Sequence, residues 1–117
     1  MSGQKGGKID IHNLIGKLPR PKGGWTLPKH KYTGPYNPLD YQLDANDRPL
    51  PGQEPYNQVD EIAMRHDICY RDNIDDKHGC DRKMLDELSE MKPNGLRERI
   101  DRRFVKTVIG AKYKLGI

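Results

Sequence analysis

The sequence has little apolar material and no long apolar run. Only 33% of its 117 residues are hydrophobic, with one Trp and one Phe, while 32% are charged. No stretch approaches the roughly 18 consecutive apolar residues of a membrane-spanning helix. The first ten residues, MSGQKGGKID, lack the apolar segment of a secretory signal peptide. We therefore expect a single domain with a small core, no transmembrane helix and no conventional signal peptide.

Cysteine is equally scarce, with only Cys69 and Cys80 in the chain. Two cysteines allow one intramolecular bridge or two free thiols, and the residues alone leave both possibilities open. The absence of a signal peptide also leaves the redox compartment undefined.

Charge is unevenly distributed along the chain. Residues 1–36 carry seven basic and one acidic residue, residues 37–91 six basic and fourteen acidic, and residues 92–117 eight basic and two acidic. Basic ends around an acidic centre indicate an anionic surface as a partner for the flanks and a cation for the middle. The alternative is ordinary solvated charge.

Glycine and proline, by contrast, are abundant before residue 57. We expect residues 1–20 to form a flexible or partly helical basic segment, with a short amphipathic turn before Pro19, and residues 21–117 to form the domain. Residues 19–56 contain too much Pro and Gly for a long helix. An irregular segment of that length is usually functional or disordered.

Three helices are predicted in the second half of the chain. Apolar residues recur every three or four positions over about 57–74, 80–91 and 96–112. Asn57 is a favourable N-cap for the first helix. The third helix places Leu96, Ile100, Phe104, Val108 and Ala111 on one face, and its other faces are strongly basic.

Three polar residues lie in phase with these apolar stripes. His66 and Tyr70 belong to the first stripe and Asp81 to the second. Because a buried carboxylate is costly without a partner, we expect the two helices to pack antiparallel with Asp81 against His66 and Tyr70. Such a carboxylate orients the imidazole and leaves its other nitrogen free as a base. The alternative is a core histidine in a purely structural network.

Asp67 follows His66 and lies about 100° further round the helix, at the edge of the expected cleft. A carboxylate there suits a hard cation with oxygen ligands, but one carboxylate is not a calcium site. The remaining ligands are expected from backbone carbonyls of the loop at residues 32–37, YTGPYN. The alternative for this loop is an ordinary turn.

These two motifs together resemble the calcium-dependent phospholipase A2 superfamily. That family pairs a Tyr-x-Gly-x-Gly calcium loop with a His-Asp-x-x-Tyr helix, and here the loop is followed by Leu39-Asp40 and the helix reads HDICY at residues 66–70. The Gly-Pro-x-Asn form of the loop is most similar to the parvovirus type, found in the unique N-terminal region of a minor capsid protein. The resemblance covers about residues 25–110.

The resemblance implies a role for each matching residue. His66 would be the general base, supported by Asp81 and Tyr70, and Asp67 a bidentate Ca²⁺ ligand. The N–H of Gly34 would donate to the oxyanion. The loop ligands would be the carbonyls of Tyr32, Gly34 and Tyr36. The family usually has glycine where this chain has Tyr36.

The resemblance also suggests a disulfide. In the secreted members a Cys three residues after the catalytic His is bridged to a Cys just before the distal Asp. Cys69 and Cys80 occupy those two positions here, so a Cys69–Cys80 bridge is expected. Two free thiols in a reducing compartment remain the alternative.

The implied fold is mainly α, a small phospholipase A2-like fold. Two antiparallel helices would carry the catalytic dyad, beside a long calcium-binding loop and a C-terminal amphipathic basic helix. The implied activity is calcium-dependent hydrolysis of the sn-2 ester of glycerophospholipids at a membrane surface, by a viral or virus-derived enzyme that breaches host membranes. The chain would be part of a larger capsid protein, in a virion that acts at the host endosomal membrane, or secreted without a signal peptide.

Several alternatives remain from the residues themselves. A basic nucleic-acid-binding or capsid-assembly module would explain the third helix but not His66-Asp67, and no specific nucleic-acid site is predicted. A calcium-dependent lipid-binding protein without catalysis would leave His66 and Asp81 unexplained. Four residues near the loop are either a membrane-contacting lip or ordinary core: Trp25, Leu27, Leu39 and Leu43.

Overall fold

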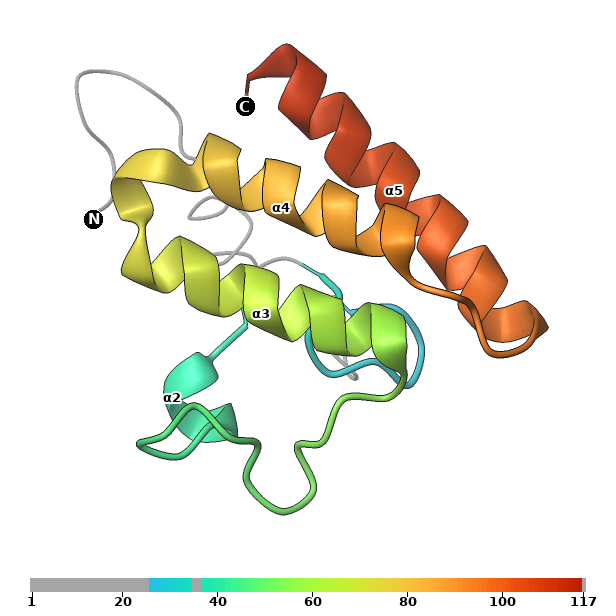
Figure 1. Ribbon diagram of the computed structural model, residues 1–117. Helices are drawn as coiled ribbons and strands as arrows, with labels where there is room; N and C mark the ends of the chain where they lie inside the picture. Colours follow the sequence, from blue (N-terminus) through green and yellow to red (C-terminus); the bar gives the residue numbers. More distant parts are fainter. Residues whose placement is uncertain (1–25, 35–36, 117) are drawn as a thin grey trace.

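The computed structural model describes residues 26–34 and 37–116, and it is mainly helical, as predicted (Figure 1). The predicted boundary at residue 20, the turn before Pro19, Trp25 and the Tyr36 ligand lie outside the described residues. The elements in order are α2 (Leu39–Gln42), α3 (Gln58–Asp72), the 3₁₀ helix η1 (Ile74–Asp76), α4 (Lys77–Glu90) and α5 (Leu96–Leu115).

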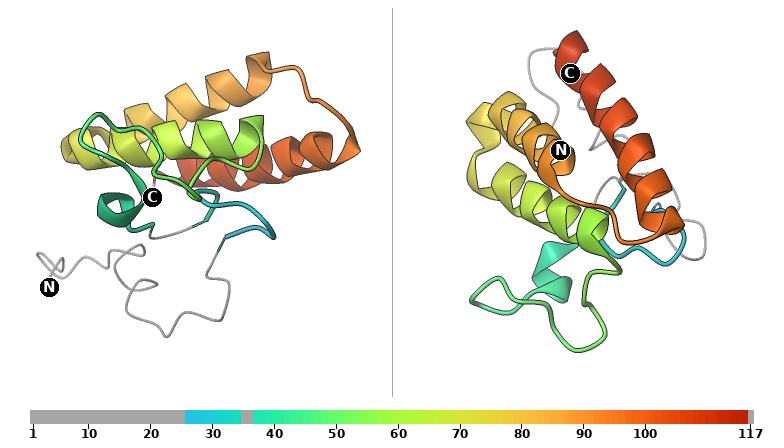
Figure 2. Two further views of the ribbon diagram at one scale, coloured as in Figure 1. Left: turned by 90° about the horizontal axis from the view of Figure 1, so that it is seen from below. Right: turned by 45° about the vertical axis from the view of Figure 1, so that its right-hand side comes forward.

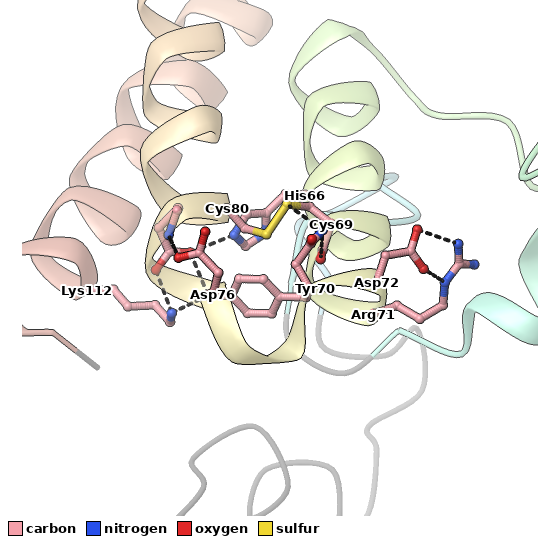
Figure 3. Close-up of a disulfide and its surroundings, with 11 residues drawn as sticks. His66, Cys69, Tyr70, Arg71, Asp72, Asp76, Cys80 and Lys112 are labelled. Carbon is pink, nitrogen blue, oxygen red and sulfur yellow. Dashed lines mark hydrogen bonds and ion pairs between the residues drawn. A yellow bond between two sulfur atoms is a disulfide. The ribbon is translucent and has the colours of Figure 1, made fainter.

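Helices α3 and α4 lie side by side and antiparallel, joined by η1 (Figure 1). Helix α3 begins after Asn57, whose side chain accepts a hydrogen bond from the backbone N–H of Asp60. Helix α4 begins three residues earlier than predicted, because the Asp76 side chain caps it by accepting from the N–H of Gly79. The Cys69–Cys80 disulfide joins the two helices (Figure 3).

The core lies where α3, α4 and α5 meet the segment before α2. Leu39 and Leu43 belong to this core rather than to a membrane-contacting lip, and Leu27 packs partly buried against it. None of the described helices is both long and apolar enough to span a bilayer. The principal core side chains are Tyr32, Leu39, Leu43, Val59, Ile62, Ala63, Met84, Leu88 and Val105.

Helix α5 packs along α4 and α3 (Figure 2), and its apolar stripe is on the outside. Leu96 is 69% and Phe104 54% exposed, while the inward face carries Glu98, Asp101 and Val105. Glu98 accepts hydrogen bonds from the N–H groups of Gln58, at the start of α3, and of Asn94. The buried face of α5 is thus determined by the hydrogen bonds that its polar side chains make inside the protein. The spacing of its apolar residues alone did not indicate which face would be buried.

Candidate active site

Helices α3 and α4 bring His66 and Asp81 into contact. The Nε2 of His66 lies 2.7 Å from the Oδ1 of Asp81, and the Tyr70 hydroxyl donates to the same oxygen at 2.6 Å. The Asp81 side chain is 2% exposed and that of His66 9%. The three residues in phase with the predicted stripes therefore form one hydrogen-bonded group beside the disulfide (Figure 3).

A lysine from α5 completes this group. The Nζ of Lys112 lies 2.7 Å from the second oxygen of Asp81 and also contacts the Tyr70 hydroxyl. Figure 3 shows Lys112 near Tyr70, which it contacts from α5. Lys112 follows the buried Val105 by seven residues, which is two helical turns, so a correct choice of the inward face of α5 would have identified it.

The surroundings keep Asp81 ionised. Burial raises the pKa of Asp81, but hydrogen bonds from His66, Lys112 and Tyr70 outweigh it, so that the pKa falls to about 2. Burial and the Asp81 carboxylate raise the pKa of the Tyr70 hydroxyl, which therefore stays a donor. Since Asp81 only accepts, Nε2 of His66 carries the shared proton, and Nδ1 of the neutral ring holds the lone pair. No hydrogen bond to Nδ1 comes from the described residues.

Three oxygens converge on the side chain of Asn37, and one of them belongs to Asp67, the residue after His66. The side-chain Nδ2 of Asn37 lies 2.8 Å from the carbonyl oxygen of Tyr32 and 3.2 Å from that of Gly34. The same nitrogen lies 2.8 Å from Oδ2 of Asp67, which follows His66 on α3. Two loop carbonyls and one carboxylate thus surround a single donor.

This donor set suits a hard divalent cation. Burial raises the pKa of Asp67 well above its usual value. The negative charge of nearby Asp60 also raises this pKa, and the hydrogen bond from Asn37 lowers it by less. No basic side chain within residues 26–34 and 37–116 pairs with Asp67. That part of the chain also holds no group of three His, Cys, Asp or Glu residues arranged to hold a metal ion, so a cation here would depend on carbonyl and amide oxygens. The residues present fit Ca²⁺.

The loop is held by a second carboxylate, Asp60, which the sequence indicated only as an acidic residue in the first helical turn. Its oxygens accept from the N–H groups of Tyr32 and Thr33 at 2.8 and 2.9 Å. They also accept from the N–H of Tyr56 at 2.9 Å. Burial opposes its ionisation, but the hydrogen bonds, that of His30 first, hold the pKa of Asp60 well below its usual range. Asp60 therefore fixes the backbone whose carbonyls face Asp67.

A second buried histidine, His30, adjoins Asp60. Its Nδ1 lies 2.8 Å from the Thr33 hydroxyl oxygen and its Nε2 2.8 Å from Oδ2 of Asp101 on α5. Asp101 also accepts from the Asn57 amide at 3.0 Å. His30 lies in the Pro- and Gly-rich segment, where no periodicity marks a buried position, and so no signal in the sequence identified it.

Comparison with known families identifies the family of this chain. Residues 23–109 match the family model described as a phospholipase A2-like domain, and the chain belongs to that family.

The relatives found by sequence are viral capsid proteins. The chain is similar to the minor capsid protein VP1 of Human bocavirus 3, with 36% identity over an alignment of 80 residues that covers 61% of this chain. VP1 of Human bocavirus 2 is 35% identical over 80 residues, and VP1 of Human bocavirus 4 is 34% identical over 82 residues. The chain spans about a tenth of the length of these relatives. No solved structure matches it.

Proposed function

We propose that this domain is a calcium-dependent phospholipase A2 that hydrolyses the sn-2 ester of glycerophospholipids at a membrane surface. The observation that supports this function is the combination of two features on neighbouring residues of α3. The His66 ring is held by Asp81, and the next residue, Asp67, contributes one of three oxygens, with the carbonyls of Tyr32 and Gly34, that converge on the Asn37 amide. Neither feature alone would distinguish a catalytic site from a structural network.

His66 is the general base in this proposal. Asp81 holds Nε2, so that Nδ1 accepts a proton from the water that attacks the ester carbonyl carbon. Tyr70 and Lys112 fix the carboxylate of Asp81 from two other directions and thereby fix the ring. As the tetrahedral intermediate collapses, the proton on Nδ1 passes to the sn-2 oxygen of the lysophospholipid, which is the leaving group. The N–H of Gly34 serves as an oxyanion donor.

The calcium ligands would be the Asp67 carboxylate and the carbonyls of Tyr32, Gly34 and Tyr36. When bound, Ca²⁺ supplies positive charge for the substrate phosphate and for the oxyanion of the transition state. Asn37 lies among three of these oxygens, so its amide group must turn aside or present its own oxygen when the ion binds.

The test is release of fatty acid from phospholipid vesicles with calcium or with excess chelator. Asp67→Asn should lose most activity and weaken calcium binding, measured independently by calorimetry, while the melting temperature changes little. Asp86→Asn is the matched control, because Asp86 is an exposed α4 carboxylate paired only with Arg82 among the described residues. Equal turnover in chelator would exclude the calcium assignment. A chain that binds duplex DNA but releases no fatty acid would favour the nucleic-acid-binding alternative.

The biological setting is part of the same proposal. The relatives are minor capsid proteins, of which this domain corresponds to a small part. We infer that this chain likewise functions within a larger capsid protein, in a virion that uses it to breach a host endosomal membrane. Antibody detection of the domain in purified particles, before and after mild acid treatment, would test that setting separately from the chemistry.

A further inference from the structure

The outward face of α5 is unlike the rest of the described surface. Its apolar stripe consists of Leu96, Ile100, Phe104, Val108 and Leu115, which are between 49% and 71% exposed. The first four are spaced every four residues along about three turns, and Leu115 lies about two turns further along the same face, so together they form an apolar strip exposed to solvent.

The charge around this apolar strip has one sign. Both acidic residues of α5, Glu98 and Asp101, are buried and hydrogen-bonded inside the protein. Arg99 and Arg103 are exposed, and their side chains make no hydrogen bond or ion pair with the described residues. Each precedes a strip residue by one position, about 100° round the helix, and therefore lies beside the strip.

Helices α3 and α4 provide the contrast. On α3 the arginines are already neutralised, since Arg65 pairs with Glu61 and Arg71 with Asp47. The exposed side chains of this pair of helices include several carboxylates, namely Glu61, Asp72, Asp86 and Glu90. These four carboxylates are balanced by four exposed basic residues of the same helices, Arg65, Arg71, Arg82 and Lys83, so an anionic surface would be attracted more strongly to α5.

The apolar strip also lies on the side of α5 that faces the segment leading into the loop with Tyr32 and Gly34. Arg97, Asp101, Phe104 and Val108 are spaced by four, three and four residues and form one row along the helix. The first two contact the segment that leads into the loop, through the carbonyl of Pro28 and the His30 ring. Phe104 and Val108 continue that row past the loop.

We propose that the apolar strip of α5, flanked by Arg99 and Arg103, is the surface by which this domain rests on an anionic phospholipid bilayer. Basic residues beside large apolar ones on one helix are the pattern of helices that lie in the membrane interface. The proposal rests on the proposed phospholipase function, and it adds the docking face and a preference for anionic lipid.

The experiment measures binding of the full chain to vesicles in excess chelator, so that no lipid is hydrolysed. Vesicles of phosphatidylglycerol with phosphatidylcholine are compared with phosphatidylcholine alone. Phe104→Ser should weaken binding to the anionic vesicles about tenfold. Arg99→Gln and Arg103→Gln should each weaken it about fivefold. Ile74→Ser is the matched control, because Ile74 is 69% exposed on η1, and it should leave binding unchanged.

A second measurement separates this proposal from the function on which it rests. Hydrolysis of a short-chain phosphatidylcholine below its micellar concentration needs the active site but no bilayer. Phe104→Ser should retain it within about twofold while losing vesicle hydrolysis. A wild-type chain that binds vesicles in the expected pattern but hydrolyses neither substrate would refute the phospholipase and leave the docking face intact.

Other occupants of the apolar strip predict different results. If another part of the chain covers it, Phe104→Ser will lower the melting temperature by several degrees and leave vesicle binding unchanged. If a second copy covers it, the variant will lose self-association in sedimentation analysis. If Arg99→Gln and Arg103→Gln weaken duplex DNA binding while Phe104→Ser leaves vesicle binding intact, the face is a nucleic-acid surface. Each of these three outcomes would overturn the proposal.

Discussion

Two histidine–aspartate pairs lie within residues 26–34 and 37–116, and they differ in whether the histidine keeps an unengaged ring nitrogen. His66 and Asp81 are 2.7 Å apart, and His30 and Asp101 are 2.8 Å apart. Both ring nitrogens of His30 are engaged and its side chain is fully buried, whereas that of His66 is 9% exposed, with one nitrogen unengaged by the described residues. A histidine–aspartate contact alone therefore does not identify a base, and it is the available second nitrogen of His66 that supports its proposed role.

The two aspartates near the loop differ in the same way. Asp60 accepts hydrogen bonds from several backbone N–H groups, and its pKa lies well below the usual range, so its charge is satisfied. Asp67 is buried with a single amide partner among the described residues, and burial raises its pKa. One carboxylate holds the structure, and the other is the proposed cation ligand.

The largest expected effect comes from replacing each of the two histidines in turn with glutamine. His66→Gln should lower turnover by about a thousandfold, since a general base contributes 10²–10⁴, and should change the melting temperature little. His30→Gln should instead destabilise the fold by about 2 kcal/mol, because it disturbs a buried network. Turnover per folded molecule and thermal unfolding are measured for both. Loss of catalysis in a fully folded His30→Gln variant would contradict the distinction drawn here.

The next comparison is within α4. Asp81→Asn should lower turnover by one to several orders of magnitude, because the carboxylate no longer holds the imidazole. Calcium affinity should barely change, since the proposed ligands lie elsewhere. Asp86→Asn should affect neither quantity, because Asp86 is exposed and paired with Arg82. A collapse in Asp86→Asn together with near-normal Asp81→Asn would overturn the assignment of the base and its partner.

Acid should act through Asp60. A carboxyl whose folded-state pKa is depressed stabilises the protein fully above its unfolded value near 4 and loses that contribution as the pH falls below it. Asp60→Asn should therefore be less stable than the wild type at pH 5, by about 3 kcal/mol. The two urea-unfolding curves should converge toward pH 2. A constant difference over that range would show that Asp60 acts by shape rather than by charge.

The smallest expected effect concerns the disulfide, which lies beside His66 and remote in sequence from His30. Closing a loop with a sequence separation of 11 stabilises by roughly 2–3 kcal/mol in the chain-entropy model. Reduction should lower the melting temperature without removing the activity of the protein that remains folded. Complete alkylation of both thiols in the native, oxidised protein would show that the bridge is absent in solution.

Sequence periodicity predicted the parts of this molecule that depend on local order. The first helix and the positions of His66, Tyr70 and Asp81 on inward stripes follow from spacings of three and four residues, while the cap at Asn57 follows from its residue type. The start of α4 was missed because the Asp76 cap is a property of one side chain, not of a repeat.

The supporting residues could not be predicted because they depend on contacts distant in sequence. Asp60 meets a loop 27 to 29 residues earlier, and Lys112 meets Asp81 31 residues away. Neither differs locally from the many solvated charges of the chain. The outward orientation of the α5 stripe has the same origin, since Glu98 and Asp101 decide which face turns inward through partners on other elements.

Helix α5 supports both histidine networks from one rigid rod. Asp101 reaches His30 and Lys112 reaches Asp81, and these two α5 residues are eleven positions apart, close to three full turns. The interval is therefore constrained in length as well as in composition. One added or deleted residue within it would rotate Lys112 by about 100° away from the carboxylate while Asp101 stayed in place. Variation in chain length is thus restricted to the loops outside this interval, and related domains that keep both contacts must keep its length.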